Sequence, residues 1–81
     1  RHIVTNNLLR NIGSLFKGDH LRNVTIANNV IEGAKTDNPL IAITQSEYVS
    51  IVGNVWNDTM ANPIDIADSE KIVNANNTWN L

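Results

Sequence analysis

The feature that most constrains this 81-residue chain is an asparagine that returns at nearly constant spacing. The four asparagines, separated by 22, 25 and 23 residues, are Asn7, Asn29, Asn54 and Asn77. Two positions after each comes a large apolar residue, namely Leu9, Ile31, Trp56 or Trp79. A unit of this length that recurs along a chain is typical of a stacked repeat architecture.

The repeat extends to further columns of mainly apolar residues upstream of each asparagine. Five positions before it lie His2, Val24, Val49 and Ile72, and three positions before it lie Val4, Ile26, Ile51 and Asn74. Thirteen positions before the last three asparagines lie Phe16, Ile41 and Ile64, followed two residues later by Gly18, Ile43 and Ile66. This alternation at period two, together with many β-branched residues, predicts short β-strands rather than helices.

Three short strands within about 23 residues cannot close a sheet by themselves. They can pair with their counterparts in the next repeat, about 4.8 Å away. The sequence therefore predicts an all-β solenoid of about three full coils plus an incomplete first coil. We place the coils at approximately 1–14, 15–38, 39–61 and 62–81.

The recurring asparagine has two roles in such a solenoid. We expect it to adopt the left-handed backbone conformation at a sharp bend, which Asn tolerates better than most residues. Its stacked amides can also hydrogen-bond from coil to coil, so Asn7, Asn29, Asn54 and Asn77 are predicted to form an asparagine ladder. The alternative is that an Asn-rich chain simply places Asn in many turns, but this leaves the registration with the apolar columns unexplained.

The segments "VTIANNVI", "VSIVGNVW" and "IVNANNTW" resemble the right-handed parallel β-helix proteins of the pectin-lyase-like superfamily. The resemblance implies three strand columns per coil, near Ile41, Val49 and Trp56 in the third coil. A competing interpretation is the leucine-rich repeat, because "LRNVTIANNVI" fits its pattern. However, the leading Leu21 is replaced by Ser46 and Ser69 in later repeats.

Composition limits which partners the chain can take. The net charge is −2 and the six basic residues are scattered, so we expect neither nucleic acid nor an anionic membrane as a partner. The sequence contains no Cys, so a domain this small has no disulfide to add to its marginal core. It starts at Arg1 and shows no polar capping segment. We therefore expect a segment of a longer polypeptide, whose remaining coils are its first partner.

The resemblance also carries the functional expectation. Pectin-lyase-like solenoids are mostly polysaccharide lyases, glycoside hydrolases, epimerases and phage tailspikes, which contact extended and often acidic glycans. It implies distal coils of a secreted, extracellular or periplasmic, polysaccharide-active enzyme, mainly structural, with catalytic residues outside this segment. Two alternatives stay open: a non-enzymatic glycan-binding solenoid, such as a tailspike segment, and a structural or adhesin spacer.

Candidate glycan contacts lie on the first strand column, whose outward residues are expected to be Lys17, Ala42 and Asp65, with Asp19, Thr44 and Ala67 beside them. Lys17 can neutralise a uronate, and Asp65 can act as an acid, a base or a calcium ligand. The favoured interpretation is nevertheless a solvated face, because Ala42 separates the two charges and no second carboxylate is fixed beside Asp65.

Other residues are assigned by their place in the repeat. Because Trp56 and Trp79 are predicted inward, Tyr48 remains as the aromatic candidate for stacking on sugars. His20 and Asp68 fall in the turn after the first strand column, where a structural role is expected. The segment is predicted to hold no metal site and no cofactor, with Ca²⁺ considered only for the longer polypeptide.

Overall fold

The computed structural model describes residues 1–33, 38–58 and 63–80, and all regular elements in these ranges are β-strands. The strands are β1 (His2–Thr5), β2 (Leu8–Arg10), β3 (Phe16–Asp19), β4 (Arg22–Ala27), β5 (Val30–Glu32), β6 (Ile41–Thr44), β7 (Glu47–Val52), β8 (Val55–Asn57), β9 (Ile64–Ala67), β10 (Glu70–Ala75) and β11 (Thr78–Asn80). The described part is therefore all-β, as the period-two alternation predicts.

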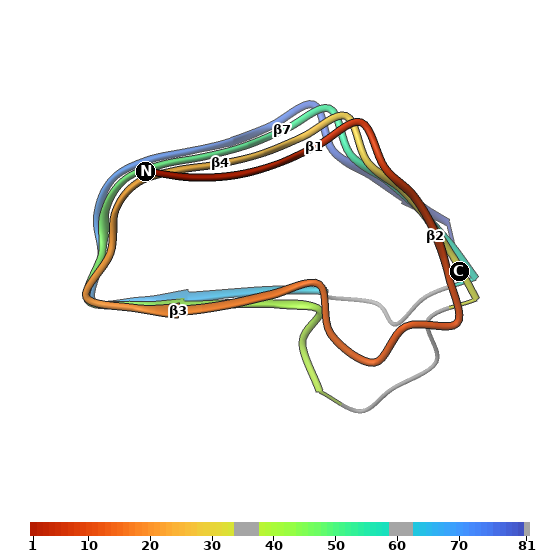
Figure 1. Cartoon of the computed structure of the whole chain (residues 1–81), viewed down its shortest axis with the longest axis horizontal. Coiled ribbons are helices and arrows are strands. Elements are labelled where there is room, and N and C mark those ends of the chain that lie inside the picture. Colours follow the sequence, from red (N-terminus) through yellow and green to blue (C-terminus); the bar gives the residue numbers. More distant parts are fainter. Residues whose placement is uncertain (34–37, 59–62, 81) are drawn as a thin grey trace.

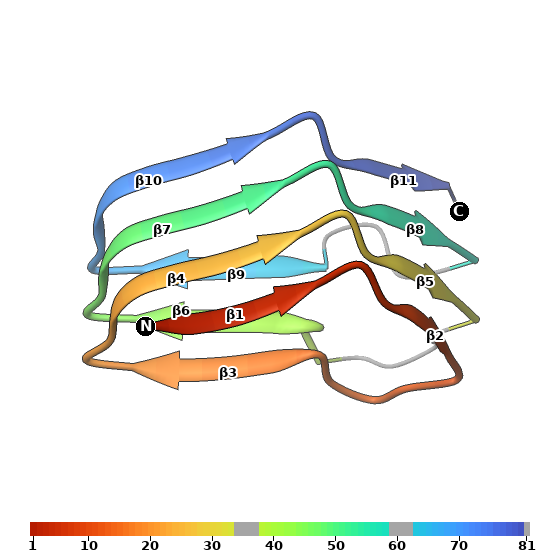
Figure 2. The same cartoon turned by 45° about the horizontal axis from the view of Figure 1, so that its top comes forward.

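The strands form three parallel sheets. Sheet A has the order β1-β4-β7-β10, sheet B has β11-β8-β5-β2, and sheet C has β3-β6-β9. In Figure 1 the chain turns clockwise as it recedes from the viewer, and Figure 2 shows successive coils stacked along one axis. The fold is a right-handed parallel β-solenoid of about three full coils plus an incomplete first one, which confirms the predicted fold class.

The strand register reproduces the columns read from the sequence. Val24 pairs with Val49 in sheet A, and Ile31 pairs with Trp56 in sheet B. In sheet C, Ile41 pairs with Ile64. Each pair places equivalent positions of consecutive repeats side by side, so the repeat spacing fixes the register.

The inward columns fill one continuous core. Its buried apolar residues are Val24, Ile26, Ile31, Leu40, Ile41, Ile43, Val49, Ile51, Trp56 and Ile64. Trp56 is fully buried and meets the Trp79 ring edge-on, with 6.0 Å between centroids. Alternation along each strand therefore leaves the remaining side chains of the three sheets as the outer surface.

The predicted asparagine ladder is present at the bend between sheets A and B. The Nδ2 group of each asparagine donates to Oδ1 of the next: Asn7 to Asn29 at 2.9 Å, Asn29 to Asn54 at 2.9 Å, and Asn54 to Asn77 at 3.0 Å. The backbone N–H groups of the first three donate to the same oxygens. Asn29 and Asn54 are fully buried, so the column satisfies polar groups that water cannot reach.

The prediction that the ladder asparagines themselves adopt the left-handed conformation is wrong. The left-handed residue is the one immediately before: Asn6, Asn28, Gly53 and Asn76, with φ from 57° to 70°. This residue makes the bend, and the chain then enters sheet B with the ladder amide pointing inward. At Gly53 a Cβ would lie 2.6 Å from Asn28 Oδ1, so the outer side of this turn is also closely packed.

Candidate functional site

Sheet C carries the predicted outward columns. Lys17 is in register with Ala42 and Ala42 with Asp65, while Asp19, Thr44 and Ala67 form the neighbouring column. A shallow groove of about 330 Å³ is lined by Lys17, Gly18, Asp19, Ala42 and Thr44. The structure thus brings Lys17 and Asp19 to one groove. Asp65 lies one rung beyond Ala42 and does not line it.

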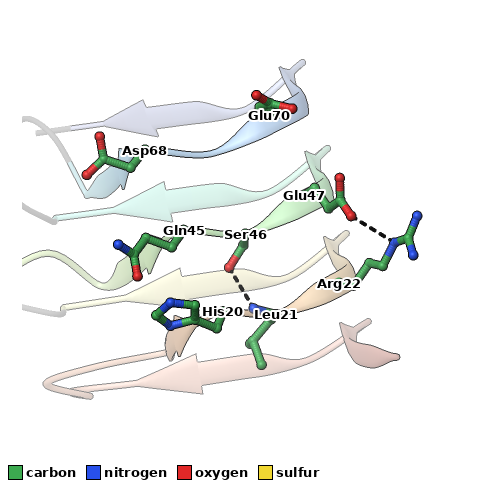
Figure 3. Close-up of a pocket in the computed structure, with 8 residues that line it drawn as sticks. All are labelled: His20, Leu21, Arg22, Gln45, Ser46, Glu47, Asp68 and Glu70. Atoms are coloured by element: carbon green, nitrogen blue, oxygen red, sulfur yellow. Dashed lines mark hydrogen bonds and ion pairs between the residues drawn. The ribbon is translucent and has the colours of Figure 1, made fainter.

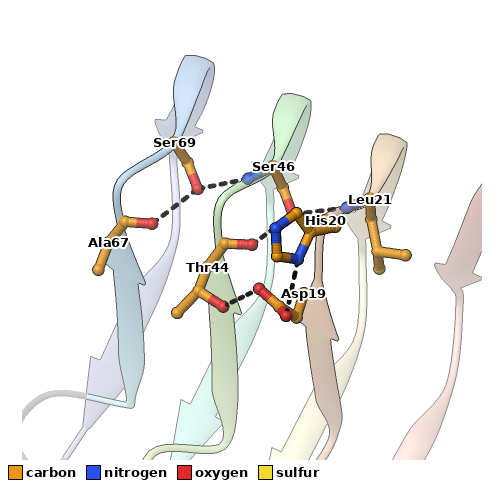
Figure 4. A network of polar contacts seen from close by, with 7 residues as sticks. All are labelled: Asp19, His20, Leu21, Thr44, Ser46, Ala67 and Ser69. Carbon is orange, nitrogen blue, oxygen red and sulfur yellow. Dashed lines mark hydrogen bonds and ion pairs between the residues drawn. The ribbon is translucent and has the colours of Figure 1, made fainter.

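A polar network occupies the end of this face (Figure 4). Thr44 Oγ1 donates to Asp19 Oδ1 at 2.7 Å, and His20 Nδ1 lies 2.8 Å from Asp19 Oδ2. Both carboxylate oxygens are therefore engaged. The hydrogen bond from Thr44, followed by that from His20, holds the pKa of Asp19 below its ordinary value, because both contacts favour the ionised carboxylate.

The pairing with Asp19 also orients the His20 ring. An ionised carboxylate only accepts hydrogen bonds, so Nδ1 is the ring nitrogen that donates to Asp19. The sequence predicts a structural role for His20 but does not predict this pair with Asp19. The signal was the register: Asp19 and Thr44 occupy the same column in consecutive repeats, directly before the turn that holds His20.

A second, larger groove follows the turn from sheet C to sheet A. It has a volume of about 610 Å³ and is lined by His20, Leu21, Arg22, Gln45, Ser46, Glu47, Asp68 and Glu70. Figure 3 shows His20, Gln45 and Asp68 on successive coils along one side, and Arg22, Glu47 and Glu70 along the other. The groove therefore runs along the solenoid axis.

Local backbone geometry produces this groove. His20, Gln45 and Asp68 each adopt the left-handed conformation, with φ of 56°, 50° and 50°. The following position points inward and carries Ser46 or Ser69 in the later coils. Leu21 N–H donates to Ser46 Oγ at 3.0 Å, and Ser46 N–H donates to Ser69 Oγ at 3.0 Å. This serine column, which the sequence analysis missed, holds the turns in register opposite the asparagine ladder.

The groove has a mixed but mainly acidic lining. Arg22 Nε lies 3.0 Å from Glu47 Oε1. The side chains of Gln45, Asp68 and Glu70 have no hydrogen bond or ion pair within the described ranges. These unpaired groups, with His20 Nε2, are what the groove offers to a ligand: carboxylate acceptors and an amide that both donates and accepts.

Tyr48, the predicted stacking residue, is not among the groove-lining side chains. It lies in β7 with φ of 57° and is 41% exposed. Arg22 from the preceding coil and Lys71 from the following coil lie 5.1 Å and 5.0 Å from its ring centroid. Both contacts are within the range of cation–π interaction, so the ring already has charged partners from both neighbouring coils.

The described residues contain no group of three or more His, Cys, Asp or Glu side chains placed to hold a metal ion. No helix with the length and apolarity to cross a membrane occurs among them either. The polar groups that line the two grooves can form hydrogen bonds and attract or repel charged ligands.

Comparison of the chain with protein-family models, with curated proteins and with solved structures gives no match.

Proposed function

We propose that this solenoid supplies mainly structural coils to a secreted, polysaccharide-active protein and contacts a glycan along the grooves beside sheet C. The observation that supports the proposal most strongly is the axial groove between the columns of His20, Gln45 and Asp68 and of Arg22, Glu47 and Glu70. Equivalent positions on the three coils that line the groove carry polar or charged side chains, about 4.8 Å apart. Such a surface suits an extended polymer of repeating hydroxyl groups.

The catalytic centre is proposed to lie on other coils. A general acid or base needs a positioned partner and a sheltered reacting group. Asp65 is exposed and separated from Lys17 by Ala42, while both oxygens of Asp19 are engaged within the protein. The coil geometry and the sequence resemblance support placing the longer protein near the pectin-lyase-like superfamily, where Ca²⁺ can serve as a cofactor.

The proposal is tested by measuring polysaccharide binding of the full-length protein by affinity electrophoresis and calorimetry. The double variant His20→Ala and Gln45→Ala is expected to lose most of the binding. Asp58→Ala is the matched control, because Asp58 is also exposed and left-handed, with φ of 54°, but lies after β8 in sheet B. Equal binding by both variants would place the glycan elsewhere.

A structural spacer is the second candidate, and the continuous asparagine and serine columns favour it. A spacer needs in-register coils but no ligand. If the solenoid is a spacer, it should bind no polysaccharide. Substitutions in the groove should then leave both stability and biological activity unchanged.

A further inference from the structure

We propose that the glycan recognised by these grooves carries no carboxylate or sulfate groups, and that Asp68 and Glu70 reject anionic polymers. The inference rests on the proposed glycan contact and adds the class of glycan to it. It differs from the acidic substrate that the sequence resemblance implies, and it follows from the charges along the axial groove.

The charge balance of the axial groove is negative. Its lining contains one permanent cation, Arg22, and three carboxylates, Glu47, Asp68 and Glu70. Arg22 already has partners within the protein, because its guanidinium pairs with Glu47 at 3.0 Å and lies over the ring of Tyr48. Lys71, the nearest cation in sequence to Glu70, lies over the same ring. An anionic polymer would thus meet carboxylates without a free cation to pair with.

The unpaired groups instead match hydroxyl donors. Asp68 and Glu70 are acceptors only, and neither has a partner within the described ranges. Sugar hydroxyls can donate charge-assisted hydrogen bonds to them, and the Gln45 amide can donate to ring or hydroxyl oxygens. The same carboxylates act against an anionic competitor, since specificity arises from repulsion of the wrong ligand as well as attraction of the right one.

The adjoining groove on sheet C does not reverse this balance. Its charged lining residues are Lys17 and Asp19, one of each sign. Lys17 has no ion pair within the described ranges, but its column continues as Ala42 and Asp65. To neutralise the repeating charge of a polyanion, the column would need a cation on each coil. Lys17 provides a cation on one coil of this column.

The test compares one polymer backbone with and without its charge. Polygalacturonate and its fully methyl-esterified form are the matched probes, beside a panel of neutral glucans, mannans and galactans. Binding is measured at low and at physiological ionic strength. The groove variant is Asp68→Asn, alone and combined with Glu70→Gln, and the control for the single substitution is Asp58→Asn, which removes one charge from the sheet B side. Asp68 and Asp58 both occupy left-handed positions that Asn tolerates.

The wild-type protein is expected to bind one or more neutral polymers, and to bind polygalacturonate only weakly. The groove variant should bind polygalacturonate about threefold to tenfold more tightly than wild type at low salt, with a smaller gain at physiological salt. The control variant should show no gain. Tight binding of polygalacturonate by the wild type would overturn the inference while leaving the proposed glycan contact standing. Failure to bind any polysaccharide would contradict the proposed function and the inference with it.

Discussion

At the scale of single residues, polar groups in register hold the coils together. Asn54 donates from its backbone N–H and Nδ2 to Asn77, and also donates from Nδ2 to the Ile26 carbonyl at 3.0 Å. Its Oδ1 accepts two hydrogen bonds from Asn29. One buried amide therefore links the coils on both sides, which explains why the position recurs as Asn.

Replacing this amide should be costly. Asn54→Leu leaves buried groups of Asn29 and Ile26 without partners, at about 1–3 kcal/mol each, so we expect a loss of roughly 3–5 kcal/mol. Asn57→Leu should cost under about 1 kcal/mol, because Asn57 is half-buried at an outward position and, among the described residues, its side chain makes one exposed hydrogen bond, from Asn80. Urea denaturation of both variants measures the difference, and equal midpoints with similar m-values would remove the structural role of the ladder.

Asp19 provides a residue-scale prediction on pH. Its pKa is lowered from the ordinary 3.8, first by Thr44 and then by His20. A carboxyl with a depressed folded pKa contributes stability that is present above 3.8 and is lost as the pH falls through the folded value. Thr44→Val should raise the pKa of Asp19 toward its ordinary value, which NMR titration of the carboxyl carbon measures. An unchanged titration midpoint would show that Thr44 does not contribute.

At the scale of elements, the turn between sheets C and A positions the axial groove. Ser46 is 4% exposed, accepts from Leu21 N–H, and donates to the Thr44 carbonyl at 2.9 Å. The contact with Leu21 links this turn to the turn of the preceding coil, and the contact with Thr44 is local and holds the left-handed residue Gln45 and the start of β7 in place. The serine column thus fixes the spacing of the groove-lining side chains on successive coils.

Removal of this hydroxyl tests the role of the turn. Ser46→Ala should destabilise by about 1–3 kcal/mol, because it leaves the partly buried N–H of Leu21 unpaired. Ser50→Ala in the following strand, β7, at an outward position of sheet A, is the control and should stay within about 0.5 kcal/mol. Similar thermal midpoints for the two variants would contradict the role assigned to the serine column.

Sheet C yields a prediction about activity. Lys17→Ala with Asp65→Ala should weaken glycan binding less than about tenfold, because an exposed charge typically contributes no more than roughly 1 kcal/mol. Any turnover by the proposed polysaccharide-active protein should fall equally little, whereas the loss of a proton-transfer group would cost about 10²- to 10⁴-fold. Abolition of turnover by either single substitution, with unfolding unchanged, would place the active site on this sheet.

The sequence predicts the elements of this fold better than its site. Apolar columns at constant spacing determine which strands pair, so Ile41 and Ile64, or Val24 and Val49, could be matched from the sequence alone. The sequence does not show which residue at each bend is left-handed. Asn6 and Asn28 each directly precede a ladder asparagine, so two consecutive asparagines compete for the same role. The Asp19–His20 pair and the serine column were missed, because they depend on side chains meeting across coils with no apolar periodicity to mark them.

At the scale of the whole molecule, the solenoid is a one-dimensional stack in which each coil contacts its neighbours. The outermost strands, β1, β2 and β3 at one end and β9, β10 and β11 at the other, each have one pairing partner. Unpaired edges of this kind promote association. The 81-residue chain alone is therefore expected to self-associate at micromolar concentration in sedimentation, and a stable folded monomer would contradict this expectation.

The central claim is that the coils stack in register through a buried column of asparagine amides, on which the groove depends. Hydrogen exchange of the side-chain amide protons, followed by NMR, tests it most directly. The Nδ2 protons of Asn29 and Asn54, which are fully buried and hydrogen-bonded, should exchange orders of magnitude more slowly than those of exposed Asn23. Equally fast exchange at all three residues would show that the column, and the register built on it, does not form.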